Sequence, residues 1–306
     1  MSIVRRVPFV SVSSLFSPAC NVLVGVMACA LGVSGVQAQT PSAAHNAQTY
    51  FERSFVLAAD RKCSLFSPSI GQALGAAALQ TRGTLLREGH ETRDIVQLEH
   101  NAQSRASETA CADSDLGIVK GRIEHAFTRW SRAARIDFPS NTYGWLVDRF
   151  SGSRDGWRLM QQANIGASPV RFGLMGKHPD DVQPVAVVSF VGRSRPYAAR
   201  LVMRDESLLP RPMIVSAGRA SVPLQSGRKA VFAARQSAAP ETLLLQGKRQ
   251  GEAWAFPHNA FSALENLDPR EEFWVEFLFR DDTVARVKME VGDLKAAQAF
   301  LALGPV

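Results

Sequence analysis

The sequence lacks the short motifs by which common enzyme classes are recognised. It has no G-x-S-x-G nucleophile elbow, no P-loop and no dinucleotide-binding glycine fingerprint. It also has no H-E-x-x-H zinc motif, because Asp94 stands where a second histidine would have to follow His90. None of its four cysteines lies at metal-binding distance in sequence from a histidine or another cysteine. We therefore predict no metal, no cofactor and no identifiable catalytic residue.

The sequence has no excess of glycine or proline, with 22 and 16 among 306 residues, which excludes collagen-like and low-complexity chains. Charged residues make up 21% and hydrophobic residues 46%, close to ordinary globular usage. The strongest apolar run, residues 22–36, is shorter than the roughly 20 residues that cross a bilayer. We therefore expect no transmembrane helix in the mature chain.

The N-terminal residues have the pattern of an export signal. Arg5 and Arg6 precede the apolar run, which ends at the small-x-small sequence Val36-Gln37-Ala38. This pattern predicts a signal peptide over residues 1–38, cleaved between Ala38 and Gln39, and a periplasmic or secreted mature protein. The alternative is a lipid anchor on Cys29, because residues 26–29 approximate a lipobox.

Removal of residues 1–38 would leave two cysteines, Cys63 and Cys111. An even number of cysteines in an exported protein indicates a disulfide, and the alternative is a pair of buried free thiols. Two helices of similar length are predicted between the two positions. Because the chain goes down one helix and returns along the next, both thiols are expected at the same end of the bundle, bonded to each other.

Residues 39–138 are predicted to form this helical bundle. Ser67-Pro68 is typical of a helix start, and Gly71 and Gly75 within that helix are expected to let neighbouring helices approach closely. Three apolar stripes at helical spacing follow. They are Ile70 to Leu85, Ile95 to Thr109, and Leu116 to Ala134.

From Trp157 the hydrophobic period changes to two. Residues 272–280 and 283–291 are the clearest strands, and Asp293 is expected to cap a terminal helix. We predict an α+β protein with a disulfide-clamped helical bundle (39–138), a connector (139–156) and an antiparallel β-sandwich or partial barrel with a C-terminal helix (157–306).

Positive charge is unevenly distributed. The whole chain has a formal net charge of +7, but residues 139–251 contain 16 basic and 7 acidic residues. Arg193, Arg195, Arg200 and Arg204 are predicted to form an outward-facing cluster that binds anionic envelope polymers or an acidic protein, with a solvated face as the alternative. Nucleic acid is not an expected partner of an exported protein.

The histidines offer weaker candidates. His100 and His125 lie at equal distances from a predicted helix turn, but each falls opposite the apolar stripe of its helix and is expected to face solvent. His258 could act as a general base together with Glu265 or Asp268. The simpler interpretation is that His258 is an ordinary polar residue at a helix start. The sequence thus favours an envelope-associated binding or structural protein, with a periplasmic hydrolase as the alternative.

Two resemblances support export. The helical region with its cysteines and the following WRLMQQ, RFGLM and ARLVMRD segments resemble uncharacterised secreted proteins of Gram-negative bacteria, which carry a domain of unknown function. Residues 272–303 resemble the end of the invasion-associated locus B family, in which two strands are followed by a glycine and an alanine-rich helix. Val291, Gly292 and Ala297 match that pattern, whereas Asp293 stands where the family tends to have an apolar residue.

Overall fold

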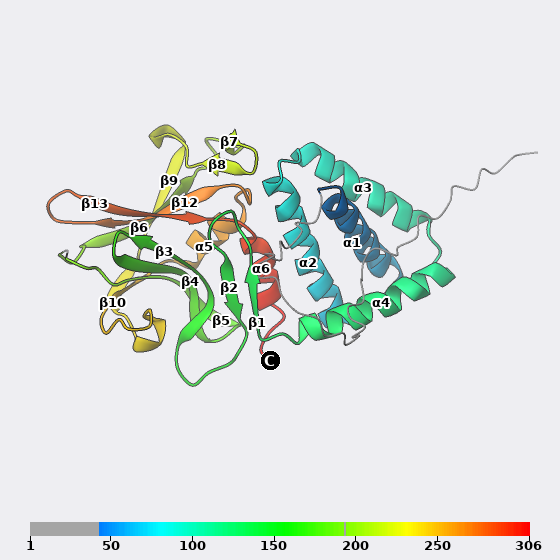
Figure 1. The fold of residues 1–306 in the computed structure, drawn as a ribbon, viewed down its shortest axis with the longest axis horizontal. Helices are drawn as coiled ribbons and strands as arrows, with labels where there is room; N and C mark the ends of the chain where they lie inside the picture. Colours follow the sequence, from blue (N-terminus) through cyan, green and yellow to red (C-terminus); the bar gives the residue numbers. More distant parts are fainter. Residues whose placement is uncertain (1–42, 193) are drawn as a thin grey trace, which may run out of the picture. The chain divides into compact units, whose positions relative to one another are not determined.

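Four helices begin the part of the chain that the structure describes, which is residues 43–192 and 194–306 of a computed structural model (Figure 1). They are α1 (Ala43–Cys63), α2 (Pro68–Arg87), α3 (Thr92–Glu108) and α4 (Ser114–Ser131). We call them together the helical layer. The predicted signal peptide, its cleavage site at Ala38 and Gln39, and Cys29 lie outside the described residues.

Local sequence explains where these helices start. Pro68 occupies the first position of α2, where its missing N–H costs nothing. The Asp113 carboxylate accepts a hydrogen bond from the backbone N–H of Asp115 at 2.8 Å and so caps α4. Ser67 has the extended backbone of a cap residue, but its side chain makes no capping hydrogen bond.

The disulfide prediction is confirmed. Cys63, the last residue of α1, is bonded to Cys111 in the turn between α3 and α4, with the two Cα atoms 5.5 Å apart. The Lys62 ammonium reinforces this end of the layer by donating to the carbonyl oxygens of Ser107 and Thr109, each at 2.8 Å. A disulfide fits a protein that resides outside the reducing cytoplasm.

The rest of the chain forms an antiparallel β-sandwich. Its larger sheet has the strand order β1-β2-β3-β4-β5-β11-β10 and its smaller sheet the order β13-β12-β6-β9. The bounds of the larger sheet are β1 (Arg135–Phe138), β2 (Trp145–Asp148), β3 (Gly156–Ile165), β4 (Ser168–His178), β5 (Asp181–Val188), β11 (Glu252–Ala255) and β10 (Arg235–Ala238). Those of the smaller sheet are β13 (Val284–Glu290), β12 (Glu272–Leu278), β6 (Ala198–Arg204) and β9 (Arg228–Phe232).

Shorter elements complete the fold. A separate hairpin is made of β7 (Met213–Ser216) and β8 (Arg219–Ser221), and two 3-10 turns are η1 (Gln225–Gly227) and η2 (Glu241–Leu243). Helix α5 (His258–Glu265) follows β11, and helix α6 (Leu294–Leu301) follows β13. The predicted α+β class, with an N-terminal helical region, antiparallel sheets and a C-terminal helix, is confirmed.

Aromatic side chains fill the space between the two sheets. Phe172 of β4 contacts Phe273 of β12 with ring centroids 5.4 Å apart, and Trp254 of β11 contacts Phe277 of β12 at 6.5 Å. The strand predicted over residues 272–280 places Phe273, Val275, Phe277 and Phe279 on one face, and all four are buried. The apolar area that these rings remove from water is the main source of stability in this part of the protein.

The strand-rich part begins earlier than the sequence pattern indicates. Helix α4 ends at Ser131, and residues 135–138, assigned to the bundle, form β1. The expected connector, residues 139–156, contains β2, whose Trp145 and Val147 are fully buried. Four-residue strands alternate too briefly to be distinguished from a helix end or a loop by periodicity.

Helix α6 joins the helical layer to the sandwich. It packs on α2 and on strands β1, β2 and β3, and Figure 1 shows it between the two. Its Phe300 lies 4.7 Å from the ring of Trp130 in α4 and 5.7 Å from that of Phe138 in β1. Residues Pro41–Val306 accordingly form one compact unit.

Candidate ligand-binding groove

Arg204 is not part of an exposed basic cluster. Its side chain is only 3% exposed and donates to both carboxylate oxygens of Glu271, each at 2.8 Å. A further N–H donates to the carbonyl oxygen of Leu209 at 2.6 Å, because the chain after β6 folds back over this side chain. The prediction that Arg204 faces outward is therefore wrong, and period-two alternation could not reveal a cover supplied by the following loop.

The other predicted members of this cluster are also engaged or not described. Arg200 is half-buried and donates at 2.8 Å to Glu276, whose carboxylate is buried. Arg195 is exposed and pairs with Glu252 at 3.4 Å, and Arg193 lies outside the described residues. The basic cluster is thus replaced by separate ion pairs.

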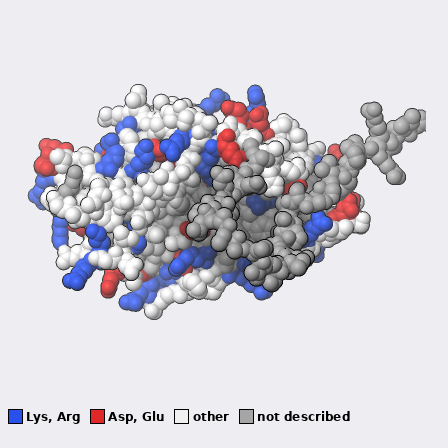
Figure 2. Space-filling model, viewed as in Figure 1, with Lys and Arg blue, Asp and Glu red and all other residues white. Residues whose placement is uncertain are grey.

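Several other arginines of residues 139–251 stabilise the fold internally. Arg149 donates to the carbonyl oxygens of Gly304 and Ser131, each at 2.7 Å, and Arg171 donates to that of Leu244 at 2.9 Å. In Figure 2, the cationic side chains that remain visible on the sandwich are spread over its surface with acidic ones between them. The Lys and Arg side chains that are visible there do not form one continuous patch in that view.

The histidines do not assemble a site. His100 and His125 are exposed, as predicted, and His258 is exposed at the start of α5. The carboxylate of Asp268 is bound by the guanidinium of Arg270 at 2.8 Å. Among the described residues, no group of three or more His, Cys, Asp or Glu side chains is placed to hold a metal ion.

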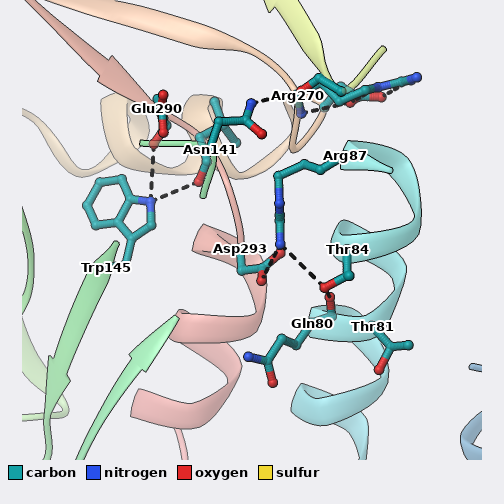
Figure 3. Close-up of polar contacts among 12 residues, drawn as sticks. Gln80, Thr81, Thr84, Arg87, Asn141, Trp145, Arg270, Glu290 and Asp293 are labelled. Atoms are coloured by element: carbon teal, nitrogen blue, oxygen red, sulfur yellow. Dashed lines mark hydrogen bonds and ion pairs between the residues drawn. The ribbon is translucent and has the colours of Figure 1, made fainter. Parts of the chain in front are cut away.

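A buried ion pair fixes α2 to α6 (Figure 3). Arg87, near the end of α2, donates to the two carboxylate oxygens of Asp293 at 2.5 and 2.9 Å, and it also reaches Thr84 at 3.4 Å. Asp293 precedes α6 as predicted, but its side chain makes no capping bond, since it is committed to Arg87. Burial raises the pKa of Asp293, and the adjacent Arg87 opposes that rise.

Glu290 is the second buried carboxylate at this junction. Burial alone would raise its pKa, but backbone N–H groups of Thr142 and Tyr143, at 2.7 and 3.2 Å, hold it below its ordinary value. The indole N–H of Trp145 donates to the carbonyl oxygens of Glu290 and Val291 nearby (Figure 3). Both carboxylates are therefore occupied by structural contacts and are not free to act as general bases.

A groove of about 610 Å³ lies along α2, between α1 and α3 on one side and α6 on the other. Pockets for small ligands typically measure about 300–1,000 Å³. We call it the α2 groove. Its lining is Tyr50, Ser54, Leu57 and Arg61 of α1, Gln72, Gly75, Ala76, Ala78, Leu79 and Arg82 of α2, Glu99 and Gln103 of α3, with Lys295, Ala299 and Ala302 from α6 and the residue after it.

The α2 groove exists because α2 carries small side chains where it faces this space. A Cβ atom added at Gly75 would meet no atom within 4 Å. Ala76 and Ala78, which also line the groove, have side chains of a single carbon atom. Gly71 behaves as the sequence predicts, since its Cβ position lies 3.2 Å from the carboxylate of Asp60 in α1. The expectation of close helix contact is wrong for Gly75.

Three cations border the α2 groove. They are Arg61, Arg82 and Lys295, and no ion pair joins any of them to another described residue. Glu99 is the only acidic residue among the described residues that line the groove, and it accepts hydrogen bonds from the Tyr50 hydroxyl at 3.1 Å and from Gln103 at 3.2 Å. The groove therefore combines a mainly apolar floor with an excess of positive charge.

Tyr50 is held in its neutral form at the groove wall. Its burial and the nearby Glu99 carboxylate raise the pKa of the Tyr50 hydroxyl to about 12. The hydroxyl consequently stays a hydrogen-bond donor at physiological pH, and it fixes Glu99 on the α3 side of the groove.

Comparisons with known proteins add no relatives. No protein-family model matches the chain, and neither the curated proteins nor the solved structures contain a match. Within the described residues, no helix is long and apolar enough to span a membrane.

Sequence reasoning did not identify the α2 groove. One signal was available, namely the small residues at Gly75, Ala76 and Ala78 in a helix that is otherwise well packed. The opposite wall could not have been found, because Lys295 and Ala299 lie more than 200 residues further along the chain.

Proposed function

We propose that this is a non-catalytic ligand-binding protein of the periplasm or the extracellular space, and that its ligand site is the α2 groove. The observation that carries the proposal is the groove itself, which is mainly apolar and of ligand size, between helices that are cross-linked on both sides. The disulfide supports the location, because such bonds persist in oxidising compartments.

The contacts of four buried carboxylates favour binding over catalysis. The carboxylates of Asp268, Glu271 and Asp293 are each bound to an arginine, and that of Glu290 accepts backbone N–H groups. A general base needs a free acceptor within reach of its substrate. The hydrolase alternative therefore has no residue among these four to support it.

The proposal is tested by filling the α2 groove. N-phenyl-1-naphthylamine, a neutral apolar dye, is expected to bind the purified protein at one site with an increase in fluorescence. Gly75→Leu adds a side chain where the backbone has open space, and it should weaken binding roughly tenfold or more by occupying the site.

Gly121→Leu is the matched control. Gly121 also lies inside a helix, is exposed on α4, and has no atom within 4 Å of its Cβ position, but it does not line the groove. This variant should bind the dye as the wild type does. If Gly75→Leu and Gly121→Leu bind equally well, or if the wild type binds no dye, the α2 groove is not a ligand site.

A further inference from the structure

We infer that the ligand of the α2 groove is a single-chain amphiphilic carboxylate, held with its anionic head between Arg82 and Lys295 and its apolar chain over Gly75, Ala76 and Ala299. This inference rests on the proposed function and specifies the chemistry of that site. It follows from the separation of charge and apolar surface along the groove.

Arg82 and Lys295 lie at the same end of the groove. Arg82 precedes Gly83, whose Cβ position would touch the Asp293 carboxylate, and Lys295 is two residues after Asp293. The Arg87–Asp293 pair therefore holds the backbone of both cationic residues in place. Two positive charges converging on one end of a groove favour a carboxylate there, since hydrogen bonds to charged groups are the strongest kind available to proteins.

Nearby acidic groups do not neutralise this end completely. Arg82 helps to lower the pKa of Asp268, and Lys295 opposes the rise that burial causes in the pKa of Glu265, so both carboxyl groups act on the cations from a distance. Asp268 is itself paired with Arg270, however, and none of these contacts is an ion pair of Arg82 or Lys295. A ligand carboxylate can therefore still make direct contacts with both cations.

The remaining groove suits an extended chain. Residues 72–82 of α2 extend about 15 Å at 1.5 Å per residue, and Gly75, Ala76 and Leu79 provide the floor along this length. Arg61 stands at the far end with Gln72, near the contact between Asp60 and Gly71. Because Arg61 is the only cation at that end among the described residues, we expect it to contribute less than the pair at the head end.

Competition against the bound dye separates charge from apolar contact. Dodecanoate, dodecanol and dodecyltrimethylammonium carry the same chain with a negative, neutral or positive head. Dodecanoate should displace the dye from the full chain most strongly, by about ten- to a hundredfold over the ammonium compound. The higher affinity of dodecanoate should shrink as salt is raised to about 1 M, where the Debye length is only about 3 Å and charge interactions are screened.

Charge-neutral variants locate the head group. Arg82→Gln with Lys295→Gln should reduce dodecanoate affinity about ten- to a hundredfold and leave dodecanol unchanged. Lys295→Gln alone, at an exposed position that should not affect folding, should reduce it by roughly threefold. Arg122→Gln, an exposed arginine of α4 outside the groove, is the control.

The two proposals fail in different ways. If the dye binds in the α2 groove but the three heads compete equally, the groove is a site and the carboxylate inference is wrong. The inference is also wrong if dodecanoate keeps its advantage in the Arg82→Gln, Lys295→Gln variant. If Gly75→Leu changes neither dye nor dodecanoate binding, the proposed function itself is wrong.

Discussion

The sandwich uses its arginines to bind its own chain, whereas no ion pair joins the cations of the α2 groove to another described residue. Arg204 donates to the carboxylate of Glu271, and Arg149 donates to backbone carbonyl oxygens. Arg82 and Lys295 border open space instead. The formal charge of a segment therefore does not show where a binding surface lies. Residues 139–251 hold most of the excess charge, and the groove cations come from the segments on either side.

Side-chain volume separates the two regions in the same way. Phe172, Phe273 and Phe277 interlock across the sandwich, so the space between its sheets is filled. The face of α2 toward the groove carries Gly75, Ala76 and neighbouring small residues, so close packing is replaced by a groove. The helical layer has smaller apolar clusters of its own, and the disulfide and the ion pair to α6 cross-link it as well.

The largest expected effect comes from removing the ion pair that joins the two regions. Asp293→Ala leaves the buried guanidinium of Arg87 without its anionic partner, and it should lower the free energy of unfolding by about 3–5 kcal/mol. Urea unfolding followed by circular dichroism measures this. Glu124→Ala removes an exposed partner of Lys120 and should cost less than about 0.5 kcal/mol. Equal losses in the two variants would contradict the role given to Arg87 and Asp293.

The disulfide should matter nearly as much. Replacing Cys63 and Cys111 together by serine opens a loop with a sequence separation of 48 residues. The unfolded chain then gains entropy, and the free energy of unfolding should fall by about 4 kcal/mol. Thermal unfolding of the double variant measures the loss. A midpoint unchanged from that of the oxidised wild type would show that the helical layer does not need this cross-link.

Replacing two glycines of α2 by alanine should change the stability of the protein in opposite directions. A Cβ at Gly83 would collide with the Asp293 carboxylate, which the bond to Arg87 prevents from moving, so Gly83→Ala should cost about 1–3 kcal/mol. Gly75→Ala meets open space and should stabilise the protein by about 0.5–1 kcal/mol through helix propensity. Melting temperatures that shift in the same direction for both variants would contradict the packing described for α2.

The smallest effect concerns Glu290 and depends on pH. Because its pKa is lowered in the folded protein, the stability that Glu290 contributes is complete above its ordinary value of 4.5 and is lost as pH falls through the lowered value. Glu290→Gln should therefore make stability decline less steeply between about pH 5 and pH 3. Glu108→Gln, at an exposed position, should follow the wild type. Parallel curves for all three proteins would mean that Glu290 does not retain its charge in the way described.

The sequence pattern was informative where neighbours along the chain decide the structure. The disulfide, the inward face of β12 and the buried side of α6 all follow from local periodicity and short connections. Glu290 is buried although the alternation of β13 would expose it. The loop that contains Thr142, more than 140 residues earlier in the sequence, covers it. Such coverings depend on tertiary packing, which period-two alternation does not contain.

The same limit applies to the candidate site. The predicted arginines were selected by charge and strand alternation. Arg204 is not exposed, because the loop that follows β6 folds back over it. The α2 groove needs Lys295 to meet Arg82 across the α2–α6 contact. That contact depends on Arg87 reaching Asp293, 206 residues away in sequence, and no local pattern predicts it.

Titration of the isotopically labelled protein with dodecanoate, followed by its ¹H–¹⁵N correlation spectrum, tests whether the α2 groove binds a carboxylate. We expect saturable shifts at the amides of Gly75 and Arg82 on α2 and of Lys295 on α6, with little change on the outer face of the four-stranded sheet. Shifts confined to that sheet, around Arg200 and Arg286, would contradict it, because they would place the anion among the ion-paired arginines of the sandwich.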